Sequence, residues 1–380
     1  MKWNIFWIVT LLMVSSCSRK NQLLLPTIEI NPLSSKVDTV HGSIINIEAF
    51  GALDIYSFDN LLFIETNDNS SFLKVYSLDK YEHLADLCPS GRASNEFINP
   101  RSVCKQLYKE GDRVMLVMTD NHITNKYIDI TESILNKKTV VTKTEDALLS
   151  SRRGYCLYNN TTDEWFVYKK VSYIDPRDQI YYPPQFSFYK KNKEDEIPVF
   201  KKMMNFPEGT NYPLFIYEGD LRLKPDGSKI SFTCFNMPYI FLFDTNSRNG
   251  VAIHEMGKLS YYDDYPSDDV TDIDLFYLDA CVTDDYIICV CGDGKQNDYD
   301  EFKRPIIRFF NWEGECLFGF YIDQRTYAIA YDSIKKRVIG LDTRTELLYE
   351  YDVKDFIKNV FVQDMEDSDF LTIAIEGRGE

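Results

Sequence analysis

The chain has few of the residues on which familiar enzyme motifs depend. It contains only four histidines, and we find no His-Glu-x-x-His, no Gly-x-Ser-x-Gly and no phosphate-binding glycine loop. Motif-bearing zinc peptidases, serine hydrolases and nucleotide-binding enzymes therefore lose support. A triad whose members are distant in sequence stays open, although no pattern points to one. We expect each histidine to be a surface or packing residue.

Basic residues are scarce relative to acidic ones. The chain has 42 Lys and Arg against 59 Asp and Glu, which gives a formal net charge of −17. Such a field repels phosphate backbones, and no basic stripe with interleaved aromatic residues occurs, so we expect no nucleic-acid partner. Acidity is also ordinary for a soluble protein of the cell envelope and identifies no other partner.

Long apolar runs are absent except at the N-terminus, where Ile5 to Val14 follows Lys2. This run is too short to span a bilayer of about 30 Å, and it is typical of a secretory signal peptide over residues 1–16. Val14, two serines and Cys17 resemble the bacterial lipobox. The resemblance implies that Cys17 is lipidated and becomes the first residue of the mature chain, whereas an ordinary signal peptide without lipid is the alternative.

The residues after Cys17 bear on location. By analogy with lipoprotein sorting in Gram-negative bacteria, Ser18 favours the outer membrane, with the lipid on Cys17 as the membrane contact. Arg19 and Lys20 stand where surface-exported lipoproteins of the Bacteroidetes have an acidic cluster, so a periplasmic and a surface-facing orientation both stay open. We expect residues 17–40 to form a tether.

Cysteine occurs at eight positions besides Cys17, with no Cys-x-x-Cys pair. Most of these residues stand singly in apolar runs, where cysteine behaves as a small hydrophobic residue. An even number in an exported protein also permits disulfides, and Cys289 and Cys291 share one face of an expected strand. We favour the structural interpretation, with disulfides as the alternative.

What the chain does have is the pattern of many short strands. Aromatic residues make up 14% of the sequence, and aromatic side chains favour β-sheets. From residue 41 onward, alternating strands recur in units of three or four, and apolar runs that end in Asp repeat at Asp79, Asp244 and Asp352. This pattern predicts an all-β, six-bladed β-propeller over residues 41–380, with a pair of β-sandwiches or a β-helix as alternatives.

Some elements are predicted individually. The fourth unit is the clearest, and we expect its strands at Leu221–Lys224, Lys229–Cys234, Tyr239–Phe243 and Val251–Glu255. We also expect a strand at Ile197–Lys201 and a short helix over 355–363. The first unit is expected to begin at Leu61.

One loop resembles a known family. Gly91, Glu96 and Phe97 match the Gly-x-Gly-Pro-x-Glu-Phe loop of the TolB-like six-bladed propeller lipoproteins of the Bacteroidetes, while Ala93 and Ser94 replace its Gly-Pro. The resemblance implies a lipid-anchored TolB-like propeller, in a family whose function is largely unassigned. Glu96 is interpreted as a residue that bonds the turn, and Arg92 and Glu96 are also candidates for a binding face.

Two further groups of residues are candidate sites. The aromatic insert with Tyr173, Arg177, Tyr181 and Tyr182 has the residue types of binding hot spots, or is a connection packed on its own rings. Two acidic segments supply oxygens of the kind that Ca²⁺ prefers, or are solvated loops. The first contains Asp263, Asp264, Asp268 and Asp269, and the second covers residues 293–301. We expect no other cofactor.

These observations favour a non-catalytic binding module on the outer membrane whose loop face engages a protein or a glycan. The alternative is a periplasmic propeller hydrolase or lactonase with a metal at its central channel. A third interpretation, an assembly component in the manner of TolB, rests on fold analogy alone.

Overall fold

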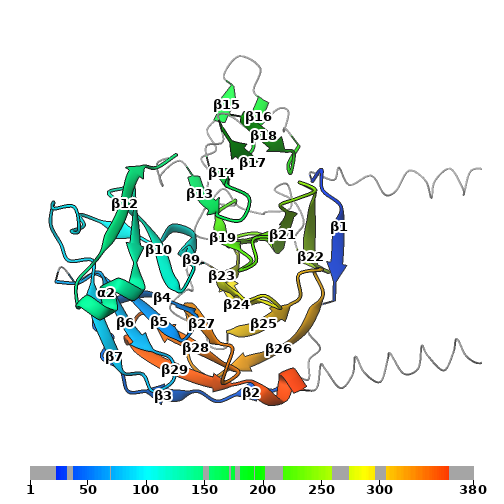
Figure 1. Ribbon diagram of the computed structural model, residues 1–380. Coiled ribbons are helices and arrows are strands. Elements are labelled where there is room, and N and C mark those ends of the chain that lie inside the picture. The colour runs from blue at the N-terminus through cyan, green and yellow to red at the C-terminus, as the bar shows by residue number, and fades with distance from the viewer. Residues whose placement is uncertain are drawn as a thin grey trace, which may run out of the picture.

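The computed structural model describes residues 23–31, 37–68, 70–148, 154–170, 173–175, 180–191, 193–201, 217–258, 274–295 and 305–358. Within these ranges the chain forms six sheets arranged around one axis, with an additional two-stranded sheet at the periphery (Figure 1). Successive strands of each sheet are antiparallel, and the sheets follow one another along the chain. The predicted six-bladed β-propeller is therefore confirmed. No helix among these residues is long and apolar enough to cross a membrane.

The first three blades occupy the N-terminal half. The first blade contains β4 (Ala52–Phe58), β5 (Leu61–Thr66), β6 (Leu73–Ser77) and β7 (His83–Leu87). The second contains β8 (Pro100–Arg101), β9 (Leu107–Glu110), β10 (Arg113–Asp120), β11 (Thr124–Asp129) and β12 (Val141–Asp146), with the 3-10 turn η1 (Val103–Lys105) and the helix α2 (Ile130–Asn136). The third contains β13 (Gly154–Asn159), β14 (Glu164–Lys169), β17 (Gln185–Lys190) and β18 (Lys193–Ile197), and carries the hairpin β15 (Tyr173–Asp175) and β16 (Ile180–Tyr182).

The remaining three blades each recruit a strand from the N-terminus. The fourth contains β19 (Gly219–Leu223), β20 (Lys229–Cys234), β21 (Tyr239–Asp244), β22 (Gly250–Glu255) and β1 (Thr27–Ile30). The fifth contains β23 (Asp274–Val282), β24 (Ile287–Lys295), β25 (Ile306–Phe310), β26 (Cys316–Ile322) and β2 (Thr39–Val40). The sixth contains β27 (Ala328–Asp332), β28 (Arg337–Asp342), β29 (Leu347–Asp352) and β3 (Ser43–Ile45).

The N-terminal strands therefore form a belt along the rim of the last three blades. β1 and β2 pair in parallel with the outer strands β22 and β26, and β3 is the antiparallel fourth strand of the sixth blade. The chain meets the propeller at Leu23, which is buried, and Leu24 N donates to Val199 O at 2.8 Å. Two belt strands thus lie inside the segment 17–40 that the sequence suggested as a tether.

Strands were well predicted where apolar residues alternate. The four strands of the fourth blade were confirmed, and the three runs ending in Asp are the third strands β6, β21 and β29. The expected strand at Ile197–Lys201 was wrong, because β18 begins four residues earlier and exposes four charged residues before the buried Ile197. β4 and α2 were missed, and residues 354–358 are helical where a short helix was expected to begin at 355.

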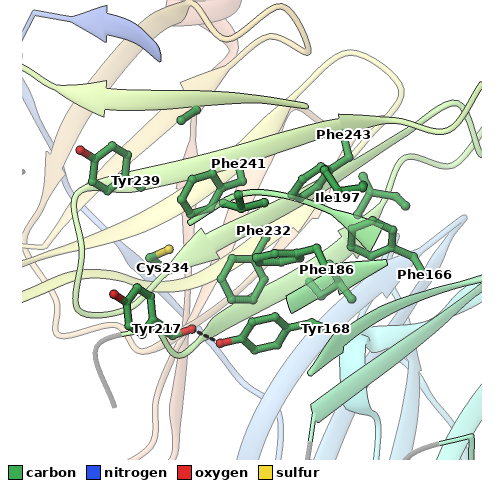
Figure 2. Packing of buried hydrophobic residues seen from close by; sticks show 14 of the residues in the cluster. Phe166, Tyr168, Phe186, Ile197, Tyr217, Phe232, Cys234, Tyr239, Phe241 and Phe243 are labelled. Atoms are coloured by element: carbon green, nitrogen blue, oxygen red, sulfur yellow. Dashed lines mark hydrogen bonds between the residues drawn. The ribbon is translucent and has the colours of Figure 1, made fainter. Parts of the chain in front are cut away.

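Aromatic rings fill the wedge between the third and fourth blades (Figure 2). Tyr168 of β14 lies 4.6 Å from Phe232 of β20, measured between ring centroids, and Phe186 lies 5.1 Å from Phe243. Figure 2 also shows the Tyr168 hydroxyl, which donates to the backbone oxygen of Tyr217, so that its polar end is satisfied. Close aromatic pairs contribute about 0.5–1.5 kcal/mol beyond area burial. The packing of so many rings in one wedge gives the aromatic-rich composition a structural role.

The inner strands define two faces of the propeller. Each blade begins with its innermost strand, so these strands run in one direction along the axis, and we call the face where they begin the entry face and the other the exit face. The connections between successive blades lie at the entry face, and so do the turns between the second and third strands of each blade. The turns between first and second strands lie at the exit face.

Candidate functional site

A buried carboxylate, Asp279 on β23, lies at the centre of the channel. Lys105 Nζ lies 2.8 Å from both of its carboxylate oxygens, and an Nη2 atom of Arg222 lies 3.2 Å from Oδ1. Ile329 N donates to Oδ2 at 2.8 Å. Groups from the second, fourth and sixth blades therefore converge on one side chain of the fifth blade. We call Asp279, Lys105, Arg222, Asp54 and Asp220 the channel hub.

The two cations of the hub make further contacts, and Lys105 reaches another blade. Lys105 Nζ is 2.9 Å from Asp54 and donates to Ile55 O at 3.2 Å, both in the first blade. Arg222 is 3.2 Å from Asp220 and donates through Nε to Ala280 O at 2.9 Å. The third blade joins through Gln106, whose Nε2 donates to Tyr158 O at 2.6 Å. Hydrogen bonds and ion pairs around the hub thus connect all the blades.

Lys105 reaches the channel because the inner strand of the second blade is interrupted. β8 and β9 both pair with β10, and η1 lies between them. Cys104 and Lys105 have positive φ angles of 69° and 44°, a region that costs non-glycine residues about 1–3 kcal/mol. A strained backbone of this kind persists only where surrounding contacts stabilise it. Here the ion pairs of the Lys105 ammonium with Asp279 and Asp54 provide that stabilisation.

Burial and charge set the protonation of the hub carboxyls. Although burial acts in the opposite direction, Lys105 and Arg222 hold the pKa of Asp279 below its ordinary value. Burial raises the pKa of Asp54 and raises that of Asp220 to about 7. Burial, together with repulsion from Asp54, also raises the pKa of nearby Glu65 to about 7. Burial therefore favours the protonated forms of Asp54, Asp220 and Glu65 relative to exposed carboxyls, whereas Asp279 stays ionised.

The hub forms the floor of a pocket of about 290 Å³ that opens on the entry face. Its wall includes Arg101, His122, Tyr155 and Lys170. Lys170 Nζ is 3.1 Å from Glu218 Oε1 and lies 4.4 Å from the centroid of the Tyr155 ring. This entry-face pocket is blind, because the paired side chains of the hub fill the channel beneath it.

The hub bears on the hydrolase alternative. Carboxylates do converge on the axis, as such an enzyme requires, but Asp54, Asp220 and Asp279 each pair with Lys105 or Arg222. Nowhere in the described ranges do three or more His, Cys, Asp or Glu side chains form a group that could hold a metal ion. The alternative therefore lacks a candidate ligand set in the described part of the channel.

The loop that resembles the TolB-like family lies on the entry face between the first and second blades. Glu96 Oε2 accepts from Ala93 N at 2.9 Å, and a Cβ at Gly91 would lie 1.9 Å from the same oxygen. Phe97 is buried under the ammonium of Lys126, 4.4 Å from the ring centroid. Glu96 thus bonds the turn, Gly91 has a φ of 154° that residues with a side chain rarely adopt, and Arg92 is exposed.

The structure places the other candidate residues only in part. The backbones of Tyr173, Tyr181 and Tyr182 belong to the hairpin β15–β16, which projects from the third blade (Figure 1). Arg177 and the four aspartates proposed for calcium, Asp263, Asp264, Asp268 and Asp269, lie outside the described residues. Binding by the hairpin and by the acidic segment stays a prediction.

The sequence did contain a signal for the hub, although we did not use it. Asp54 and Asp279 are charged residues with uncharged neighbours, and Asp220 and Arg222 alternate with leucines; all four lie in the first strand of their blade. A charge in that position faces the channel when the strand is innermost. Lys105 carried no such signal, because it lies in the irregular turn η1.

Cysteines and histidines have structural surroundings. All eight cysteines in the described residues are free, and burial raises the pKa of the Cys289 and Cys291 thiols. They pack as small hydrophobic residues. His254 pairs with Glu29 of β1 at 2.7 Å, and His41 pairs with Asp323 at 2.9 Å, so two histidines fasten the belt to the propeller.

The fold and the hub together define a six-bladed propeller with an ion-sealed channel. It is similar to a putative exported protein from Bacteroides fragilis (11% identity over 91% of this chain and 95% of that chain, TM-score 0.48). It is also similar to a member of the DUF4221 family from Bacteroides vulgatus (9%, 88% and 98%, TM-score 0.49). An auxiliary nutrient binding protein from Bacteroides thetaiotaomicron is a third such structure (12%, 79% and 68%, TM-score 0.42).

No family model matches the chain, and no curated protein matches it. The similarity to the solved structures is too low to assign a function.

The hub predicts a strong effect of removing one charge. Asp279→Asn leaves Lys105 and Arg222 without their shared anion, and we expect the free energy of unfolding to fall by about 3–5 kcal/mol, as for other broken buried pairs. Chemical denaturation measures the loss. Glu313→Gln is the control, because Glu313 pairs with Lys229 at the surface and its loss should cost about 1 kcal/mol or less. Equal effects of the two substitutions would show that the hub is not a stabilising centre.

The raised pKa of Glu65 predicts a pH dependence. Its protonated form is favoured in the folded state, so its contribution to stability is complete below the unfolded pKa near 4.5 and is lost as the pH rises through about 7. Glu65→Gln keeps an acceptor for Ser102 N and the Tyr56 hydroxyl, both bonded to Oε1. We expect its melting temperature, relative to that of the wild type, to rise by a few °C between pH 5 and 8. A pH-independent difference would contradict the assignment.

Proposed function

We propose that the protein is an outer-membrane lipoprotein, lipidated at Cys17, whose non-catalytic propeller binds a protein or glycan partner. The entry face is the proposed binding surface, and its features favour a protein. The resemblance of the loop at Gly91, Glu96 and Phe97 to TolB-like lipoproteins supports this assignment, as does the signal sequence that ends before Cys17.

Exposed apolar side chains on the entry face carry the proposal. Phe50 is 69% exposed, Ile98 51% and Ile123 55%, and all three lie in connections on the entry face. Ile98 and Ile123 belong to adjoining segments, because Asn121 N donates to Asn99 O. Exposed apolar residues near a pocket with polar walls are typical of a protein interface.

The sealed channel supports binding rather than catalysis. A propeller enzyme needs reactive groups that are accessible to substrate, whereas the hub carboxylates are occupied by Lys105 and Arg222. Arg101, His122 and Lys170 on the pocket wall supply donors at the mouth. The entry face therefore combines apolar contact area with a polar recess, which suits recognition of a surface with a projecting acidic side chain.

The belt determines how close the propeller is to the proposed anchor. Leu23 is buried against the propeller, so only residues 18–22 separate it from Cys17. A fully extended chain of that length spans about 20 Å at most. A lipid on Cys17 would therefore keep the rim at the third and fourth blades close to the membrane.

The anchor predicts a change in fractionation. Cys17→Ser removes the sulfur that carries the lipid, so we expect the variant to leave the outer-membrane fraction and appear in the soluble fraction. Membrane fractionation with immunodetection measures this. Cys316→Ser is the matched control, since Cys316 lies in the fifth blade and is partly exposed. Retention of the Cys17 variant in the membrane would contradict the proposal.

The binding face predicts site-dependent crosslinking in living cells. A photoreactive phenylalanine analogue at Phe50 or Ile123 should form one discrete adduct, whereas the same analogue at Ile334, in an exit-face turn, should not. Ile98→Asp should abolish the adduct without lowering the melting temperature. An adduct whose added mass is removed by glycosidases would identify a glycan partner, and equal adducts from both faces would refute a dedicated binding face.

A further inference from the structure

A second pocket, of about 590 Å³, opens on the exit face. Every blade contributes to its wall, either from its innermost strand or from the turn that follows, and the wall includes Phe58, Tyr108, Asn160, Pro225, Asp285 and Tyr331. The hub separates this exit-face pocket from the entry-face pocket, and the two share no lining residue. Its volume lies within the range of about 300–1,000 Å³ that is typical of ligand sites.

One side chain of the wall points to a ligand. Tyr331 is only 5% exposed, and its hydroxyl has no hydrogen-bond partner in the part of the chain that the structure describes. The Tyr331 backbone is fixed by Ser57 Oγ, which donates to Tyr331 O at 2.8 Å and accepts from Tyr331 N at 3.1 Å. A buried hydroxyl without a partner costs about 1–3 kcal/mol, which a bound donor or acceptor would offset.

Tyr331 packs edge to face on Phe309, with 5.9 Å between the ring centroids, and lines the same pocket as Tyr286 and Asp285. Burial raises the pKa of Tyr331, and repulsion from Tyr286, Cys281, Asp332 and Asp285 adds to the effect. Thr283 Oγ1 accepts from the backbone N–H groups of Asp285 and Tyr286 at 3.2 and 2.9 Å, which fixes the turn that presents them.

The wall combines aromatic side chains with hydrogen-bonding groups, and its three aspartates outnumber its two lysines. Phe58, Tyr108, Tyr286 and Tyr331 supply aromatic rings. Asp59 and Lys109 pair with each other at 3.1 Å, so the other charged residues of the wall are Asp284, Asp285 and Lys336. The pocket contains no arginine, so the bidentate contacts that favour phosphate or sulfate ligands are missing from its described wall.

We propose that the exit-face pocket binds the end of a neutral oligosaccharide. Sugar rings present apolar faces that pack on aromatic side chains, and their hydroxyl groups both donate to carboxylates and accept from a phenol. Tyr331 and Asp285 both line this pocket, so that it offers a sugar residue a phenol and a carboxylate. This site is separate from the entry face, and it requires neither the lipid anchor nor the protein partner.

Calorimetric titration of the purified mature chain with neutral trisaccharides of glucose, mannose, galactose and xylose tests the proposal. We expect at least one to bind at millimolar concentration or below. Tyr331→Phe should weaken that binding about three- to ten-fold, because one hydrogen bond is lost. Its melting temperature should stay unchanged or rise, since the hydroxyl has no partner to lose in the free protein. If the Tyr331 hydroxyl were purely structural, Tyr331→Phe would lower the melting temperature and leave the affinity for the sugar unchanged.

Two further variants make the outcome decisive. Asp285→Asn should also weaken binding, whereas Lys170→Ala, in the entry-face pocket, should leave it unchanged. Absence of binding by all four trisaccharides would overturn the proposal, as would affinities that are equal in the wild type, Tyr331→Phe and Asp285→Asn. Crosslinking at Phe50 and Ile123 tests the entry face and does not depend on sugar binding. A negative titration would therefore contradict the sugar site without contradicting the proposed function of the entry face.

Discussion

The pairing of Asp279 with Lys105 and Arg222 is the interaction on which the rest of the channel depends. A buried carboxylate between two cations is stable only when its remaining lone pairs are satisfied, and Ile329 N supplies that bond from the neighbouring blade. Propeller blades contact one another mainly through apolar side chains, which slide more easily than ion pairs. The hub adds fixed distances at the axis, and it allows the strained turn at Lys105 to persist.

Sealing the axis changes what the propeller can do. An open channel gives one continuous site to which both faces contribute, whereas the hub leaves two blind pockets that share no wall. The entry face has exposed apolar residues, with Arg101 and Lys170 at the mouth of its pocket, and the exit-face pocket has aromatic residues with one more aspartate than lysines. Because the chemistry differs, each face fits a different class of ligand. The two proposals, a protein partner on the entry face and a sugar on the exit face, rest on this division.

The alternation of apolar and polar residues predicted the blades, because it depends on which face of each strand is buried. The four strands of the fourth blade were read correctly for that reason. It failed where charge has a structural role: Asp54 interrupts β4, and the charged residues of β18 conceal an edge strand. The loop at Gly91 and Glu96 could be recognised because its bonds are local in sequence. The hub could not, since its members are up to 225 residues apart and only the closed ring brings them together.

The belt explains which sheet edges carry charge. β1 and β2 cover the outer edges of the fourth and fifth blades, and β3 is itself the outer strand of the sixth; the outer strands of the first three blades have no such cover among the described strands. An exposed edge strand invites pairing with another chain unless charged residues discourage it. β12 and β18 follow this rule, with the exposed sequences Thr142–Thr144 and Lys193–Glu196. The outer strands that the N-terminal segment does not cover are therefore the ones that need exposed charged residues to prevent pairing with another chain.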